Sequence, residues 1–203
     1  QLSTAEECSA DDMVLVARVC RSCGLRDYTA LAALAERLTP CVPGLTTDSV
    51  LQLAAAYSTL GVLNAPLFEA VAAALIRTWL PAAGSKTKGT GDAPSLATLA
   101  AVARAFSAQR FRHEELFDRV TQLMVTAGIE GASPGEALSL LHSYAYLRLD
   151  ASLGEQWEAL ERQALSPGHD ALGAGPISEL CHILFIARRA DARLQEVIGL
   201  FEA

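Results

Sequence analysis

The chain has 203 residues, of which 51% are hydrophobic and 19% charged, and its formal net charge is −7 at pH 7. This hydrophobic share argues against a disordered chain, and the abundance of Ala and Leu favours helices. The acidic balance argues against a general polyanion-binding protein, because phosphate backbones require a surplus of Lys and Arg.

The sequence also bears on membranes and disulfides. No run approaches the roughly 18–20 uninterrupted apolar residues of a membrane span, so we expect no membrane insertion. The five cysteines have no regular spacing. This pattern predicts a reducing compartment and no disulfide framework.

A repeated pattern divides the chain into five units that each contain two helices joined by a short turn. The predicted units are residues 9–45, 46–80, 94–131, 132–170 and 174–203. One column of the first helices sets the register: Cys20, Tyr57, Phe106, Tyr144 and Phe185. Allowing for one insertion, this column recurs about every 38 residues. Its aromatic residues could stack on bases, but we favour core packing.

The first two units each begin with a helix that has apolar residues at i, i+3, i+4 and i+7. These residues are Met13, Val16, Ala17 and Cys20, then Val50, Leu53, Ala54 and Tyr57. Asp27 and Asn64 follow the turns, and we expect each to cap a second helix. Cys20 and Cys23 are expected to be buried helix residues, because no second pair completes a zinc site.

Residues 81–95, which are rich in Gly, Pro, Ser and Thr, predict a flexible insertion after the second unit. This segment holds the only two lysines, Lys86 and Lys88. They could form a basic loop that becomes ordered on RNA or on a neighbouring subunit. The alternative is a tolerated insertion without a binding role.

The last three units continue the pattern. In the third unit the apolar stripe is Leu99, Val102, Ala103 and Phe106. The expected caps of the second helices are His113, Asp150 and Asp191. A single hairpin cannot bury its own apolar face, so the units must stack on one another. We therefore predict one all-α domain over residues 1–203, an α-solenoid of about five helix-turn-helix repeats.

Two columns outside the apolar stripe could contact nucleic acid. One reads Arg18, Ala55, Arg104, His142 and Ile183, and the other, at the turn, reads Gly24, Gly61, Arg110, Arg148 and Arg189. Cations at equivalent positions would form a ladder for phosphates or stacked bases. The RNA-binding candidates are thus Arg18, Arg104, Arg110, His142, Arg148 and Arg189, with Lys86 and Lys88. The alternative is that the arginines are solvated residues favoured by the helix dipole.

No catalytic, metal or cofactor site is predicted. The four histidines lie in separate parts of the chain, and no phosphate-binding loop or nucleophile motif occurs. We expect neither an enzyme nor a small-molecule substrate.

The segments SLATLAAVARAFSAQRFRHEELFDRV and SVLQLAAAYSTLGVLNAPLFEAV resemble the organellar heptatricopeptide and octotricopeptide repeats. They also resemble the helical region of FAST-kinase-like proteins, which often precedes a RAP domain. The resemblance covers nearly the whole chain. It implies a mitochondrial matrix protein that binds RNA or forms part of the mitochondrial ribosome, with its targeting peptide outside this sequence. The chain departs from these families in its acidic charge and in lacking a RAP segment.

Our first hypothesis is accordingly a non-catalytic scaffold in an organellar ribonucleoprotein, most simply a mitochondrial ribosome subunit that contacts proteins and rRNA. The second is a protein-only interaction scaffold or an accessory subunit of a mitochondrial membrane complex. The surroundings of the candidate arginines distinguish the two hypotheses. RNA binding is favoured if these arginines share one face with few carboxylates beside them, and disfavoured if Glu and Asp lie between them.

Overall fold

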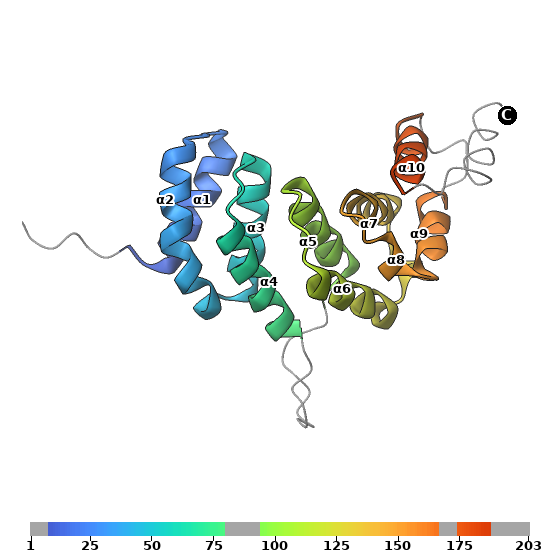
Figure 1. The fold of residues 1–203 in the computed structure, drawn as a ribbon, viewed down its shortest axis with the longest axis horizontal. Coiled ribbons are helices and arrows are strands. Elements are labelled where there is room, and N and C mark those ends of the chain that lie inside the picture. Colours follow the sequence, from blue (N-terminus) through green and yellow to red (C-terminus); the bar gives the residue numbers. More distant parts are fainter. Residues whose placement is uncertain (1–7, 80–93, 167–173, 188–203) are drawn as a thin grey trace, which may run out of the picture. The chain divides into compact units, whose positions relative to one another are not determined.

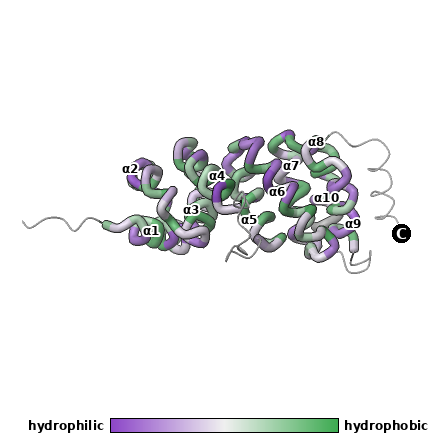
Figure 2. The backbone as a smooth tube through the Cα atoms, turned by 90° about the horizontal axis from the view of Figure 1, so that it is seen from below, coloured by the Kyte–Doolittle hydropathy of each residue, from purple (hydrophilic) through white to green (hydrophobic). Residues whose placement is uncertain are grey.

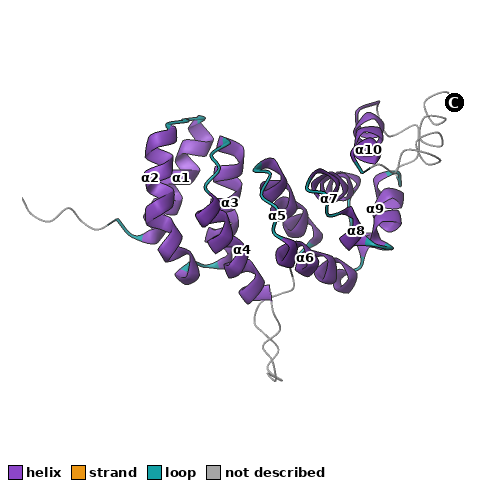
Figure 3. Ribbon diagram, in the orientation of Figure 1, coloured by secondary structure: helices purple, strands orange, loops and turns teal. Residues whose placement is uncertain are grey.

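The computed structural model describes residues 8–79, 94–166 and 174–187. Every regular element within these ranges is a helix, and none of the described residues forms a strand (Figure 3). The predicted all-α class is confirmed. The chain divides into two compact units, Gln1–Ala82 and Ala83–Ala203.

The first unit contains two helical hairpins. Its elements are α1 (Ala10–Cys23), α2 (Tyr28–Leu38), the 3-10 helix η1 (Thr39–Gly44), α3 (Thr47–Leu60) and α4 (Ala65–Trp79). Within each hairpin the two helices pack together, and between hairpins α1 packs against α3 and α2 against α4 (Figure 1).

The second unit contains two further hairpins and one more helix. Its elements are α5 (Leu96–Ala108), α6 (Glu114–Ala127), the 3-10 helix η2 (Ile129–Gly131), α7 (Pro134–Tyr146), α8 (Asp150–Leu153), α9 (Gln156–Ala164) and α10 (Ala174–Ile186). Helix α7 is central, because α5, α9 and α10 all pack against it. The last predicted unit is described only through α10.

The first helix of each of the four hairpins starts with a hydroxyl cap. Ser9, Thr46, Ser95 and Ser133 each accept a hydrogen bond from the backbone N–H three residues later. Such caps satisfy an N–H that the helix leaves without a partner. Ser95 therefore caps α5, which begins at Leu96, and most of the predicted insertion lies outside the described residues.

Three of the predicted caps of second helices are confirmed. Asp27, Asn64 and His113 accept hydrogen bonds from the backbone N–H groups of Ala30, Leu67 and Leu116 at 2.9–3.1 Å. The prediction for Asp150 is wrong, because α8 starts at this residue without a side-chain cap. Gly154, at φ 52°, separates α8 from α9 after a single turn. Asp191 lies outside the described residues.

The predicted apolar stripes of α3 and α5 are confirmed as core. All eight of their residues are buried, and Tyr57, Phe106 and Tyr144 are completely so. Phe185 was placed wrongly, since its side chain is 69% exposed. The buried residues of α10 are Leu180, Ile183 and Leu184, so the helical period puts Leu184 in the core column.

Two expectations for α1 are also wrong. Its buried residues are Met13, Val14 and Ala17, and the helix packs against both α2 and α3. Val16 is exposed, Cys20 is half-buried and Cys23 is exposed. Figure 2 shows hydrophobic and hydrophilic residues mixed along α1.

Candidate nucleic-acid interface

All four first helices end in the same backbone turn. Five residues after the core column, a backbone N–H donates a hydrogen bond to the carbonyl oxygen of the core-column residue. The bonds run from Leu25 to Cys20, Val62 to Tyr57, Phe111 to Phe106 and Leu149 to Tyr144, at 2.8–3.2 Å. This 6→1 bond defines the Schellman motif, in which the residue before the donor is left-handed. The turn is thus a structural repeat across both units.

The left-handed residue of this turn is the turn column predicted from the sequence. Gly24 and Gly61 occupy it in the first unit, with φ of 65° and 71°. Arg110 and Arg148 occupy it in the second unit, with φ of 54° and 58°. This conformation costs a non-glycine residue about 1–2 kcal/mol. Backbone strain of this kind concentrates at functional sites, which makes the two arginines notable among the candidates.

Arg110 lies beside an aromatic pair. Its guanidinium carbon is 5.9 Å from the centroid of the Tyr146 ring. Tyr146 in turn stacks on His142, with ring centroids 5.7 Å apart and an interplanar angle of 15°. Both rings are half-buried, while Arg110 is exposed. We call Arg110, His142 and Tyr146 the Tyr146 cluster.

The Tyr146 cluster joins residues from both predicted columns. Arg110 follows the end of α5, and His142 lies one turn before the end of α7. These two helices pack side by side (Figure 1). A partly exposed ring beside a guanidinium is an arrangement that stacks on unpaired bases. Tyr146 was not predicted from the sequence, although its i+4 spacing from His142 was a readable signal.

The other described candidates lie elsewhere. Arg104 is exposed on α5, and Arg148 is exposed just beyond the end of α7. Arg18 is exposed on α1, in the first unit. Ile183, which was expected outside the apolar stripe, is fully buried. Arg189, Lys86 and Lys88 lie outside the described residues.

Carboxylates are sparse on the two helices that carry these cations. Helix α5 contains no acidic residue, and α7 contains only Glu136. The Glu136 carboxylate accepts the backbone N–H of Ser133 at 2.8 Å, at the opposite end of α7 from Arg148. The exposed carboxylates of this unit lie at or near α6 and α9, on η2 and on α10: Glu114, Glu115, Asp118, Glu130, Glu155, Glu158 and Glu179. The cations of α5 and α7 thus have few carboxylates on their own helices, whereas α6 and α9 carry both signs of charge, with Arg119 and Arg162 among their carboxylates.

Arg112 differs from its neighbour Arg110. Its guanidinium forms a 2.7 Å salt bridge with Glu114 at the start of α6, and both side chains are exposed. A cation that already has a carboxylate partner has less to gain from a phosphate. Arg112 therefore provides an internal comparison for the candidate arginines.

The same residues offer no metal site. In the part of the chain that the structure describes, no three His, Cys, Asp or Glu side chains gather closely enough to hold a metal ion. The five cysteines are free thiols. None of the described helices is long and apolar enough to cross a membrane.

The sequence was also compared with known proteins. No protein-family model matches it, and no curated protein matches it significantly.

Proposed function

We propose that this chain is a non-catalytic helical-repeat scaffold of an organellar ribonucleoprotein, a mitochondrial ribosome subunit that contacts protein subunits and rRNA. The assignment to an organelle and to a ribonucleoprotein rests on the resemblance of the sequence pattern to organellar helical repeats. The contact with RNA rests on the geometry at the ends of α5 and α7.

One observation carries the RNA part of the proposal. Arg110 and Arg148 occupy a strained left-handed position that Gly24 and Gly61 fill in the first unit, and Arg110 lies against the Tyr146 ring. Arginine gives no conformational advantage in this turn, so a role for its side chain explains its presence. RNA supplies both phosphates for the guanidinium groups and unstacked bases for an aromatic ring.

The repeated architecture supports the scaffold part. Besides the shared turn, each unit contains the same hydrogen bond between successive hairpins. Tyr57 on α3 donates to the Leu31 carbonyl on α2, and Tyr144 on α7 donates to the Phe117 carbonyl on α6, both at 2.8 Å. Repetition of one contact between neighbours is the organisation of a solenoid. We therefore propose that the chain forms an α-solenoid of about five repeats.

The test is binding of the purified chain to labelled mitochondrial rRNA fragments across a salt series. The variant is Arg110→Gly/Arg148→Gly, which gives both turns the residue used in the first unit and so keeps the fold. We expect wild-type binding to weaken with salt. In the variant, the slope of log K against log salt should fall by about 0.7 for each phosphate that is no longer neutralised.

The matched control is Arg112→Gln, which removes a cation that is already paired with Glu114. It should bind almost as tightly as the wild type. If the wild type does not bind RNA at low salt, or if Arg112→Gln weakens binding as much as the double variant, the arginine assignment is wrong.

A second candidate function is a protein-only scaffold. It is favoured by the net charge of −7 and by the exposed carboxylates at α6 and α9. This candidate predicts that the chain does not bind RNA at any salt concentration. The salt series therefore separates the two functions.

A further inference from the structure

Arg110 and Arg148 share a backbone position, but their surroundings differ. The Arg110 guanidinium lies over the Tyr146 ring, with its central carbon 5.9 Å from the ring centroid. In the part of the chain that the structure describes, no aromatic ring lies against Arg148. Neither arginine forms a salt bridge with another described residue. The two side chains are therefore suited to different groups of a ligand.

A close contact between α5 and α7 brings Arg110 to this ring. The Ser107 hydroxyl on α5 donates a hydrogen bond to the Ser143 hydroxyl on α7 at 3.2 Å, and both side chains are buried. The Arg110 backbone N–H donates to the Ser107 carbonyl oxygen at 2.9 Å. Tyr146 follows Ser143 by three residues, which is close to one helical turn. The serine contact thus sets the positions of both members of the pair.

His142 stacks on the Tyr146 ring and holds its plane. The two ring centroids are 5.7 Å apart, and the interplanar angle is 15°. Both rings are half-buried, whereas Arg110 is exposed. The guanidinium group is therefore the member of the Tyr146 cluster that a ligand reaches most freely.

The fold does not require a ring at this place. Tyr146 lies two residues after the core column, and the other first helices with the shared turn have small, exposed residues there: Ser22, Thr59 and Ala108. In the first unit, Gly24 and Thr59 hold the two places that Arg110 and Tyr146 hold in the second unit. The cation and the ring thus occur together where the first unit has neither, which points to a joint role.

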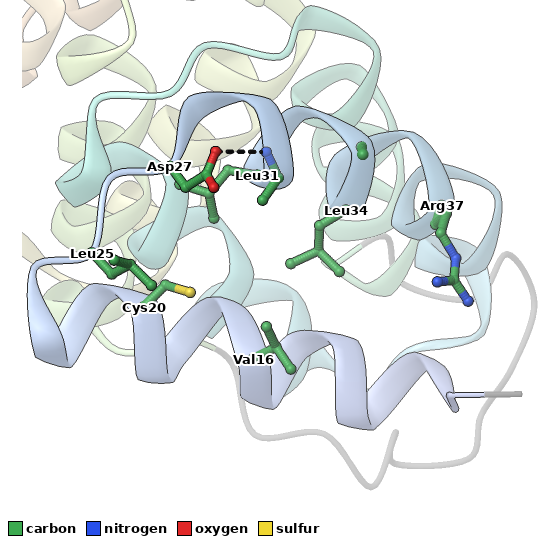
Figure 4. A pocket seen from close by; sticks show the side chains of 9 residues that line it. Val16, Cys20, Leu25, Asp27, Leu31, Leu34 and Arg37 are labelled. Carbon is green, nitrogen blue, oxygen red and sulfur yellow. Dashed lines mark hydrogen bonds between the residues drawn. The ribbon is translucent and has the colours of Figure 1, made fainter. Parts of the chain in front are cut away.

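Figure 4 shows the corresponding turn of the first hairpin. Leu25 and Cys20 lie there beside a mainly apolar pocket of about 300 Å³ between α1 and α2. None of the residues that line this pocket is aromatic, and Arg37 lies at the end away from the turn. The first unit therefore provides an internal comparison for the pair in the second.

We propose that an unpaired base of the bound RNA stacks on the Arg110 guanidinium, which Tyr146 holds from behind, while Arg148 binds a backbone phosphate. A guanidinium is planar and weakly hydrated, so a base can stack on one face while an aromatic ring covers the other. An arginine without such a ring acts through its charge and its N–H donors, which match a phosphate.

This inference rests on the proposed contact with RNA and gives the two turn arginines separate roles in it. Tyr146 is then a positioning residue, because it acts through Arg110. A continuous duplex keeps its bases stacked inside, so the ligand of this site is a strand with unpaired bases.

The experiment compares two labelled strands of equal length, bound to the full chain across a salt series. One is single-stranded oligo(A) RNA, and the other is an abasic ribose-phosphate strand with the same phosphates. Tyr146→Leu removes the ring and should weaken binding of oligo(A) by about 5-fold or more at every salt concentration. The slope of log K against log salt should not change, because stacking is not ionic, and binding of the abasic strand should stay the same.

Arg148→Gly should give a different result. It removes a phosphate contact, so the slope should fall by about 0.7 for both strands. A loss that is confined to oligo(A) in this variant would contradict the division of roles.

Two variants control for the loss of the ring. Tyr146→Phe keeps the ring and should bind both strands as the wild type does, which separates the effect of the ring from a general loss of structure. Tyr28→Leu makes the same change as Tyr146→Leu at a 57% exposed tyrosine of the first unit and should have no effect.

The base-stacking role is wrong if Tyr146→Leu leaves the affinity for oligo(A) unchanged or weakens the abasic strand equally. It is also wrong if the wild type does not bind oligo(A) at low salt. Binding of mitochondrial rRNA fragments in the same buffers then decides separately whether the proposed RNA function stands.

Discussion

The hydroxyl of Tyr144 donates a 2.8 Å hydrogen bond to the carbonyl oxygen of Phe117, and the two rings meet edge to face with centroids 4.9 Å apart. Tyr57 makes the equivalent bond to Leu31 at 2.8 Å. Leu31 and Phe117 each lie four residues after the cap of a second helix. The same tyrosine contact therefore joins successive hairpins in each unit.

Removing either hydroxyl should destabilise the protein. Tyr57→Phe and Tyr144→Phe keep the buried rings but remove the hydroxyl that bonds to the Leu31 or Phe117 carbonyl, at a cost of about 1 kcal/mol. Tyr144→Phe also removes the 2.9 Å contact with the Thr121 hydroxyl, but it leaves the Phe117 carbonyl with a donor, because Thr121 bonds to it at 3.0 Å, whereas Tyr57→Phe removes the donor to the Leu31 carbonyl. Urea denaturation followed by circular dichroism gives both values. Tyr28→Phe, at an exposed tyrosine, should leave stability unchanged.

The same tyrosines predict a loss of stability at alkaline pH. Burial raises the pKa of Tyr57 and Tyr144 above the usual 10.0, because the phenolate would lose its hydration. The unfolded chain then releases these protons more readily than the folded one. Stability from this source is complete below pH 10 and falls as the pH rises above it. Denaturation midpoints between pH 8 and 11 should fall less steeply for Tyr57→Phe/Tyr144→Phe than for the wild type, and parallel curves would exclude this linkage.

Replacing an arginine at the turn should stabilise the second unit. Arg148→Gly relieves the left-handed strain and should gain about 1 kcal/mol, even though glycine makes the unfolded chain more flexible. Arg110→Gly should gain less, because it also removes the interaction with the Tyr146 ring. Thermal melts report both changes. The reciprocal Gly61→Ala should destabilise the first unit, and a stabilising effect there would show that strain is not the cause.

His113 should be replaceable by a better cap. Its Nδ1 accepts the Leu116 backbone N–H at 3.1 Å, where Asp27 and Asn64 serve in the first unit. His113→Ala should cost about 1 kcal/mol, whereas His113→Asn should keep or increase stability. Thermal melts of the two variants test this order. Equal losses in both would mean that the imidazole acts by packing and not as a cap.

Much of the fold follows from local chemistry and could be predicted from the sequence. The stripes of α3 and α5 repeat with the helical period, and Asp27 and Asn64 stand where a cap is needed. Phe185 was misplaced because it was assigned to the core column for its aromatic side chain. The residues of α10 that follow the i, i+3, i+4 spacing of a buried helix face are Leu180, Ile183 and Leu184. Val16 was misplaced because α1 has two apolar faces, and only knowledge of the neighbouring helices tells which one is covered.

The candidate site was less predictable. Arg110 and His142 were selected as members of separate columns, and their approach to Tyr146 depends on the packing of α5 against α7. The left-handed backbone of Arg110 and Arg148 cannot be read from arginine itself, which rarely adopts it. The only sequence evidence for this left-handed backbone was that the two arginines align with Gly24 and Gly61 in the turn column.

The turn shared by Gly24, Gly61, Arg110 and Arg148 has an evolutionary consequence. The chain follows the same path whether this position carries a guanidinium group or no side chain at all. A single codon change can therefore add or remove a charge at one hairpin while its neighbours stay in place. The order of charged and uncharged turns can diversify among related proteins faster than the fold that holds them.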